Sequence, residues 1–168
     1  MTRAYNHFVT VILLGMLASL TPLAIDMYLP SIPDISKDLH TGIEKVELTI
    51  SIFLIFYALG QLFGGVFSDR MGRRVPILIG LLGFSISSFI LFFATSIEVL
   101  YMFRAVQACF GGIAVVNYSA IIRDLFHGKE AAKVFSTISS IMLLAPLLAP
   151  AIGSFIVSYF DWNYIFLL

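Results

Sequence analysis

Residues 65–74 read GVFSDRMGRR and join two long apolar runs, residues 46–68 and 75–94. A tight turn between two helices needs a residue that adopts unusual backbone angles, and Gly72 provides it. The stretch also places strong charges of both signs together, on Asp69, Arg70, Arg73 and Arg74. Positive charge that sets topology explains the arginines, but not the carboxylate or the spacing of Gly65 and Gly72. The stretch therefore predicts two spanning helices joined by a short charged loop that does more than set topology.

The composition around this loop is that of a protein with several membrane-spanning helices. The 168 residues are 60% hydrophobic and 12% charged, against about 25% charged in an ordinary soluble domain. The apolar residues form blocks close to the ~20 residues that a spanning helix needs. Five spans are predicted, at about residues 8–29, 46–68, 75–94, 98–119 and 132–159. A sixth begins after Asp161 and is too short to cross, so we expect one all-α domain, residues 1–168, that is a truncated product or a fragment.

Prolines and basic residues set the expected topology. Pro30 and Pro33 should end the first span, because proline cannot continue a helix, and the link over residues 31–47 is polar. One side receives seven basic residues, which are Arg3, Arg70, Arg73, Arg74, Arg123, Lys129 and Lys133. The other side receives Lys37 and Lys45. Because Lys and Arg favour the cytoplasmic side, the N-terminus should be cytoplasmic and the 31–47 link external.

A carboxylate interrupts the first apolar run, at Asp26 in the phrase DMYLP of residues 26–30. A charge inside a bilayer costs at least ~2.5 kcal/mol and tends to mark an ion, proton or substrate path. Arg104 lies in the fourth span, and both residues should lie roughly 6–9 Å below the outer surface at 1.5 Å per residue. Three interpretations are open. The two side chains share a polar cavity, form a structural ion pair, or one of them reaches the interface.

Further polar residues are candidates for the same cavity. Gln107 follows Arg104 by three residues and so shares its helix face. Gln61 is either a substrate contact or an interhelical hydrogen bond, and its neighbours Gly60 and Gly64 are expected to let helix backbones approach closely. The full set of candidate cavity residues is Asp26, Tyr28, Gln61, Arg104, Gln107, Asn117 and Tyr118.

The fifth span carries two prolines four residues apart, in APLLAPAIG at residues 145–153. Each proline removes a backbone donor and bends a helix, which membrane helices tolerate where neighbours satisfy the freed carbonyls. Ala149 and Gly153 form a face of small residues. We expect a bent, closely packed helix at a domain seam.

No motif in the sequence indicates catalysis, a cofactor or a metal site, so we do not expect an enzyme. The formal net charge is zero, which provides no basic surface for nucleic acid. Cys109 is the only cysteine, so it can form neither an intrachain disulfide nor a CxxC metal site. His7, His40 and His127 fall in predicted loops or ends.

The motifs together resemble the major facilitator superfamily. GVFSDRMGRR resembles the signature between its second and third helices, and residues 104–107 resemble its fourth-helix motif. A further segment resembles the fifth-helix motif of its drug/proton antiporters; this segment contains Ala145, Pro146, Ala149, Pro150 and Gly153. DMYLP, with Arg123 and Asp124 after the fourth span, is similar to the bicyclomycin-resistance (Bcr/CflA) branch of multidrug exporters. Ala108 departs from the usual glycine, and Ala145 from the common Gly-Pro.

The resemblance implies the N-terminal six-helix half of a twelve-helix fold, with five full spans and a truncated sixth. It implies a multi-pass antiporter of the bacterial inner membrane that exports drug-like molecules and is driven by a proton gradient, without a cofactor. Asp26 would carry the proton and Arg104 would tune its proton affinity. The cytoplasmic gate would comprise Gly65, Asp69, Arg70, Gly72, Arg73, Arg74, Arg123 and Asp124.

The implied partners are a small-molecule substrate, protons, the lipid bilayer, and a missing C-terminal half or another membrane protein. Two alternatives stay open. The whole protein is a proton-coupled transporter of a polar metabolite, or the 168-residue chain is a fragment that transports nothing and binds other membrane helices.

Overall fold

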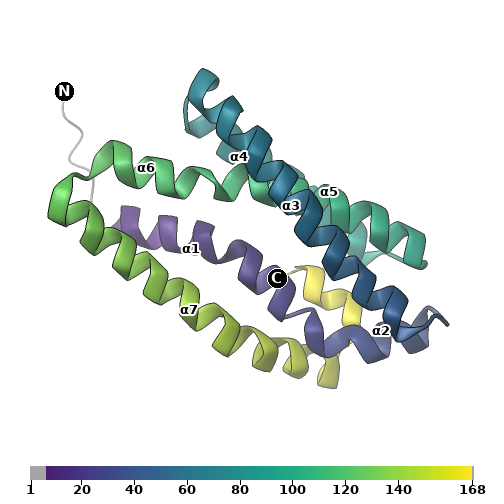
Figure 1. The fold of residues 1–168 in the computed structure, drawn as a ribbon. Helices are drawn as coiled ribbons and strands as arrows, with labels where there is room; N and C mark the ends of the chain where they lie inside the picture. Colours follow the sequence, from purple (N-terminus) through teal and green to yellow (C-terminus); the bar gives the residue numbers. More distant parts are fainter. Residues whose placement is uncertain (1–6, 168) are drawn as a thin grey trace.

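A computed structural model describes residues 7–167, and this range is helical between short links (Figure 1). The elements in order are α1 (His7–Asp26), η1 (Leu29–Ser31), α2 (Ile32–Asp38), α3 (Ile43–Met71), α4 (Arg74–Phe92), α5 (Ile97–Val115), α6 (Asn117–Leu125), α7 (Gly128–Tyr159) and η2 (Trp162–Leu167). The labels η1 and η2 denote 3₁₀ helices. No strand occurs within residues 7–167, in agreement with the all-α prediction.

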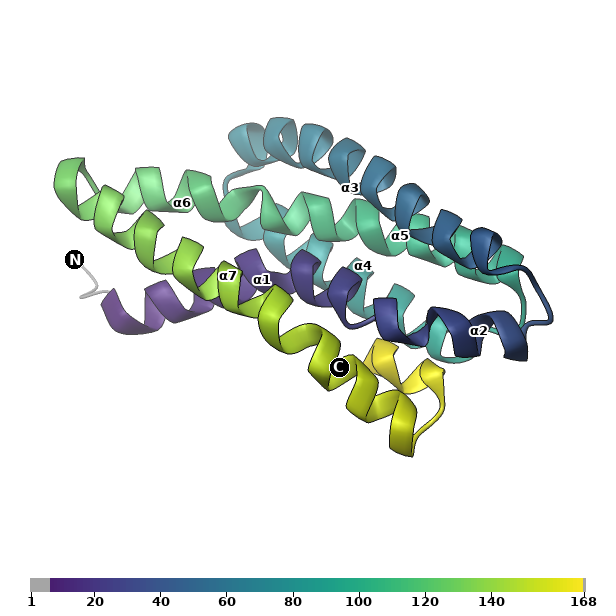
Figure 2. The ribbon, with the colours of Figure 1, turned by 60° about the horizontal axis from the view of Figure 1, so that its bottom comes forward.

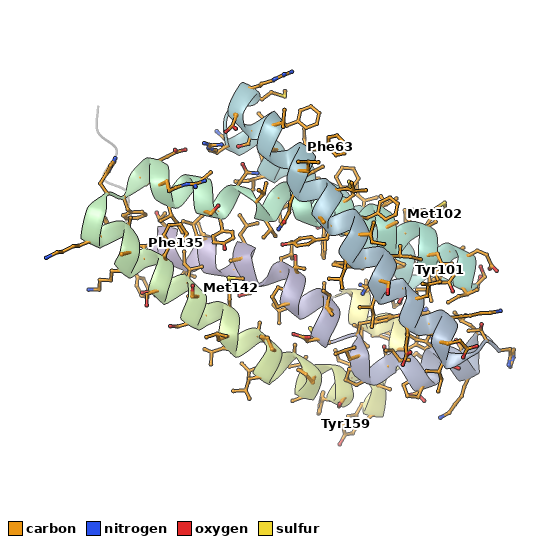
Figure 3. The ribbon with its side chains drawn as sticks, in the orientation of Figure 1. Phe63, Tyr101, Met102, Phe135, Met142 and Tyr159 are labelled. Atoms are coloured by element: carbon orange, nitrogen blue, oxygen red, sulfur yellow. The ribbon has the colours of Figure 1, made fainter. Side chains whose placement is uncertain are left out.

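Five helical stretches are long and apolar enough to cross a membrane, which confirms the predicted number. They are residues 7–38, 43–71, 74–92, 97–125 and 128–159. Their outer faces are apolar: Figure 3 shows Phe63 of α3 and Tyr159 of α7 pointing away from the bundle, and both side chains are exposed. Soluble monomers rarely expose a continuous apolar surface of this extent, whereas such a surface is stable in contact with lipid tails. The chain is a multi-pass membrane protein.

The helices form two closely packed groups, in which α5 packs against both α3 and α4, and α1 lies along α7 (Figure 1 and Figure 2). Small residues make the first group possible. A Cβ on Gly60 of α3 would meet the backbone of Cys109, and a Cβ on Gly64 would lie 2.6 Å from the Cα of Ile113. The predicted packing role of Gly60 and Gly64 is confirmed. Gly112 of α5 contributes in the same way against the α3 backbone.

The helix of the first span ends at Asp26, three residues before the predicted end at residue 29, and shorter helical segments follow it. Pro30 has no N–H to bond the carbonyl of Asp26 four residues earlier, and its ring would clash with that carbonyl, so α1 stops at Asp26. The Tyr28 carbonyl beyond the break accepts from the Ser31 hydroxyl at 2.6 Å and from the Ser31 N–H at 3.0 Å. The chain then continues as η1 and α2 to Asp38. The predicted polar link is thus largely helical.

The fourth span is also interrupted, at Val116 between α5 and α6. The Asn117 side-chain amide donates to the Ile113 carbonyl at 2.8 Å. Such a bond to the carbonyl four residues earlier offers an alternative to the helical ladder and often bends a helix. Helix α6 then runs to Leu125, six residues beyond the predicted end of this span. Arg123 and Asp124 therefore lie on a helix and not after it.

The last two elements close the end of the bundle at which α2 lies. Helix α7 continues through both prolines without interruption. Beyond it, η2 folds back between α4 and α7 (Figure 2), with Trp162, Ile165 and Phe166 buried. Trp162 Nε1 donates to Asp38 Oδ2 at 2.9 Å, and Asn163 Nδ2 donates to the Phe92 carbonyl at 2.8 Å. The predicted stub after Asp161 is therefore a packed part of the fold.

Candidate functional site

A fully buried arginine marks the centre of the candidate site. Arg104 of α5 has no exposed surface, and aromatic rings surround its guanidinium. The Cζ atom lies 4.5 Å from the Tyr28 ring centroid, 4.4 Å from that of Phe53, and 5.8 Å from that of Phe166. Cation–π contacts contribute about 0.5–2 kcal/mol each, whereas burying an ion costs several kcal/mol. The cage therefore offsets only part of the cost of burying this charge.

Hydrogen bonds link Arg104 to α1 and α4. Its Nη1 donates to the Ala24 carbonyl at 3.3 Å and to Gln107 Oε1 at 3.1 Å. Gln107 Nε2 donates in turn to Ser88 Oγ of α4 at 2.7 Å. The predicted sharing of one helix face by Arg104 and Gln107 is confirmed. Arg104 Nε and Nη2 have no hydrogen-bond partner within the described residues, so the guanidinium is only partly satisfied.

A cavity of about 90 Å³ adjoins this network. Four elements contribute to its wall, which consists of Leu20, Leu23, Ala24, Met27, Phe84, Ser88, Arg104, Gln107, Ile165 and Phe166. The wall is apolar except for the side chains of Ser88, Arg104 and Gln107, which form the hydrogen-bond network described above. The site therefore combines apolar surface with a few convergent polar groups, the usual composition of a small-molecule site.

Asp26 does not join Arg104, and this corrects the prediction of a shared cavity or ion pair. Within residues 7–167 no salt bridge or hydrogen bond links the two side chains, and Asp26 is absent from the wall of the 90 Å³ cavity. The physical reason is helical geometry. Ala24 lines the cavity beside Arg104, and residues two apart point to opposite sides of a helix.

Asp26 is a partly buried carboxylate at the end of α1, next to the break that Pro30 causes. It lies three residues before Leu29, where η1 begins. Its predicted depth below the outer surface stays a prediction.

The other predicted cavity residues fall into two groups. Tyr28 belongs to the arginine cage, is fully buried, and shares a 3.0 Å hydrogen bond between its hydroxyl and that of Thr49. Gln61 and Tyr118 are partly buried on other helices. Asn117 is buried, but its amide bonds α5 carbonyls at the helix break. These last three residues are not on the wall of the cavity beside Arg104.

A second cluster lies at the opposite end of the bundle, around Arg73. Its Nε donates to Asp124 Oδ2 at 2.9 Å, and its Nη1 donates to Asp69 Oδ1 at 2.8 Å and to Ser68 Oγ at 2.9 Å. Hydrogen bonds from Arg73 to Asp124 and then to Asp69 raise its pKa above the ordinary value for arginine. The cluster ties the α3–α4 turn to α6.

The remaining residues of the predicted cytoplasmic motif are less constrained. Gly72 has φ +79° and ends α3, which confirms its predicted role in the turn. A Cβ on Gly65 would meet no atom within 4 Å, so close packing does not explain that glycine. Arg70, Arg74 and Arg123 are exposed, and their side chains form no ion pair with another described residue.

The fifth-span motif turns its small residues inward and a proline outward. Ala145, Ala149 and Gly153 are buried, whereas Pro146 is exposed. A Cβ on Gly153 would lie 3.0 Å from the carbonyl carbon of Met27, beyond the end of α1. Close packing of this face is confirmed, and its neighbour within the described chain is α1.

Among the side chains that contact Arg104 or Gln107, sequence analysis missed Phe53, Ser88 and Phe166. Phenylalanines are frequent on lipid-facing surfaces, and the chain has sixteen of them, so their identity carries little information. Ser88 lies in a Ser-Ser pair in the third span. That pair of hydroxyls in an apolar run was a usable signal for an interhelical hydrogen bond.

The fold is that of a multi-pass membrane protein with a buried polar centre. The model of the Major Facilitator Superfamily matches residues 14–168. The chain therefore belongs to the Major Facilitator Superfamily, whose members are transporters and not enzymes.

Individual relatives cover the chain almost completely. It is 40% identical over 166 residues to a bicyclomycin resistance protein homolog of Haemophilus influenzae, and the matched region covers 99% of this chain and 42% of the relative. It is 41% identical over 156 residues to the uncharacterized MFS-type transporter YdgK of Bacillus subtilis, covering 92% of this chain and 39% of the relative. It is 31% identical over 159 residues to multidrug resistance protein D of Escherichia coli, and the matched region covers 94% of this chain and 40% of the relative. The chain thus spans about two fifths of the length of these relatives.

Proposed function

We propose that the chain forms the first half of a proton-coupled antiporter that exports drug-like amphipathic molecules. The observation that carries the proposal is Asp26, a partly buried carboxylate at a proline-induced helix break in the first candidate span. Transporter sites in the membrane interior are typically built at such discontinuous helices. Similarity to relatives named for bicyclomycin and multidrug resistance supports a drug-like substrate.

In this mechanism Asp26 takes up and releases the transported proton. Ionisable groups inside a bilayer are costly and serve proton relays in many pumps and transporters. Asp26 has no cationic partner within the described residues, so its charge is compensated by water or by the exchanged substrate. Arg104 holds the α1, α4 and α5 segments together beside this break and does not neutralise the carboxylate directly.

The Arg73 cluster would act as the cytoplasmic gate. It joins the α3–α4 turn to α6 through one arginine and two carboxylates. Exposed ion pairs are each worth about 0–1 kcal/mol, so the link holds one arrangement and releases it at low cost. That property suits a contact that is broken and remade in every transport cycle.

The proposed location is the bacterial inner membrane, with the N-terminus in the cytoplasm. Six basic residues lie at the end of the bundle formed by the α3–α4 turn, the end of α6 and the start of α7: Arg70, Arg73, Arg74, Arg123, Lys129 and Lys133. Lys37 and Lys45 lie at the other end. This bias favours a cytoplasmic Arg73 cluster. Arg3, also counted in the prediction, lies outside the described residues.

A chimera provides the test, in which this chain replaces the matching part of the Haemophilus influenzae relative. Asp26→Asn in the chimera should abolish drug export from cells and leave the amount of membrane protein unchanged. The matched control is Asp34→Asn, which removes an exposed carboxylate of α2 and should leave export intact. Unchanged export in Asp26→Asn would refute the proton-carrier role. Uptake of a polar metabolite by a chimera that exports no drug would refute the substrate class.

A further inference from the structure

The turn that follows Asp26 is held in place by the side chain of Tyr28. The Tyr28 N–H donates to the Ile25 carbonyl at 3.1 Å, so residues 25–28 form one compact unit that contains Asp26. Tyr28 has no exposed surface. Its ring packs against Arg104, with 4.5 Å between the guanidinium Cζ atom and the ring centroid. The position of Tyr28 therefore sets the position of the turn that carries Asp26.

Within the described residues, the side chain of Tyr28 has one hydrogen-bond partner, which is the hydroxyl of Thr49 on α3. Thr49 is fully buried, and its Oγ1 lies 2.6 Å from the Val46 carbonyl oxygen and 3.0 Å from the Tyr28 hydroxyl oxygen. A hydroxyl has one proton to donate and two acceptor positions. The carbonyl can only accept and is the closer of the two, so Thr49 donates to Val46. Tyr28 therefore donates its own proton to Thr49.

We propose that Thr49 is a positioning residue, which fixes the turn of residues 25–28, and with it the Asp26 carboxylate, by accepting the hydrogen bond from Tyr28. A buried hydroxyl without an acceptor is costly, and the guanidinium of Arg104 beside it only donates. Without the Thr49 oxygen, Tyr28 has to move to find an acceptor, and the turn moves with it. The importance of this contact for transport rests on the proposed function, whereas the positioning itself does not.

The test measures how fast a hydrophobic carbodiimide modifies Asp26 in the purified 168-residue chain in detergent micelles, at one fixed pH. Asp26 is only partly buried, and peptide mass spectrometry locates the product. Thr49→Val removes the acceptor and keeps the side-chain shape. It should raise the rate constant about threefold or more, the scale of one lost hydrogen bond, because a released carboxyl reaches the reagent more often.

Two further threonine variants show whether the oxygen of Thr49 is responsible. Thr49→Ser keeps this oxygen and should react at the parent rate. Thr137→Val is the matched control, since it removes an exposed hydroxyl of α7 that bonds only its own helix, and it should also leave the rate unchanged. Circular dichroism checks the helix content of each variant.

Tyr28→Phe separates this role from packing alone. It keeps the ring beside Arg104 and leaves Thr49 bonded to Val46, so no hydroxyl is left without an acceptor, and the rate should rise less than in Thr49→Val. The double variant should react like Tyr28→Phe alone, for the same reason. A parent rate in Thr49→Val, or a double variant as fast as Thr49→Val, would overturn the proposal.

The double variant also keeps the test decisive where Thr49→Val fails to fold. It contains no unpaired hydroxyl, so it should fold and react faster than the parent. Failure of the double variant to fold, or a parent rate of modification, would then overturn the proposal. No step of this test measures transport, so the result is separate from the export assay of Asp26→Asn in the chimera.

Discussion

Replacing Gly60 by alanine should separate α3 from α5. A Cβ on Gly60 would meet the carbonyl oxygen of Cys109 and would lie 2.8 Å from its carbonyl carbon and 2.9 Å from its Cα. Backbone atoms of a helix cannot turn aside as a flexible side chain can, so the two helices must shift apart. Gly65 provides the matched control. It lies in the same helix, and a Cβ there would meet no atom within 4 Å.

The magnitude follows from two opposing terms. Overpacking a tight interface costs about 1–3 kcal/mol. Alanine in a helix is favoured over glycine by about 1 kcal/mol, and this gain is common to Gly60→Ala and Gly65→Ala. The difference between the two variants therefore isolates the overpacking cost, about 1–3 kcal/mol. For a chain of this length it corresponds to a difference in melting temperature of roughly 2–12 °C.

The assay is thermal unfolding of the purified chain in detergent micelles, followed by far-ultraviolet circular dichroism. Gly65→Ala should melt at or slightly above the parent, and Gly60→Ala clearly below Gly65→Ala. Equal melting temperatures for the two variants would refute the close approach of α3 and α5 at Gly60.

Two further predictions concern the Arg73 cluster and the fifth-span motif. In the chimera, Asp69→Asn should reduce drug export more than Arg70→Gln. The reason is that Asp69 bonds Arg73 at 2.8 Å, whereas Arg70 forms no such bond with a described residue. Equal export rates would favour a purely topological role for the loop. Gly153→Ala should lower the melting temperature by several degrees, since the added Cβ would meet the Met27 carbonyl group just beyond the end of α1. An unchanged melting temperature would contradict this packing.

The sequence was sufficient for the number of spans and for local packing, because both depend on composition and short-range spacing. Apolar blocks predicted the five spans, and Gly72 predicted the turn between two of them. Gly60 and Gly64 predicted a close helix contact, which their four-residue spacing places on one helix face. These features need no knowledge of which helices are neighbours.

The candidate site was predicted only in part, because its geometry depends on rotation about the helix axes. Two of the three interpretations placed Asp26 and Arg104 together, yet the face of α1 toward Arg104 carries Ala24. The short helices η1 and α2 after α1 were missed, because the polar stretch 31–47 carries no apolar pattern that predicts a helix. Phe166 was expected in a stub after Asp161, and its contact with Arg104 depends on a chain reversal.

The most direct test of the account is proton movement driven by drug in vesicles. Inside-out membrane vesicles with the chimera, energised with a proton gradient, should release protons from their interior when an exported drug is added. Asp26→Asn should abolish that release, and Asp34→Asn should leave it at the parent level. Full drug-driven proton release by Asp26→Asn would contradict the central claim that this carboxylate carries the exchanged proton.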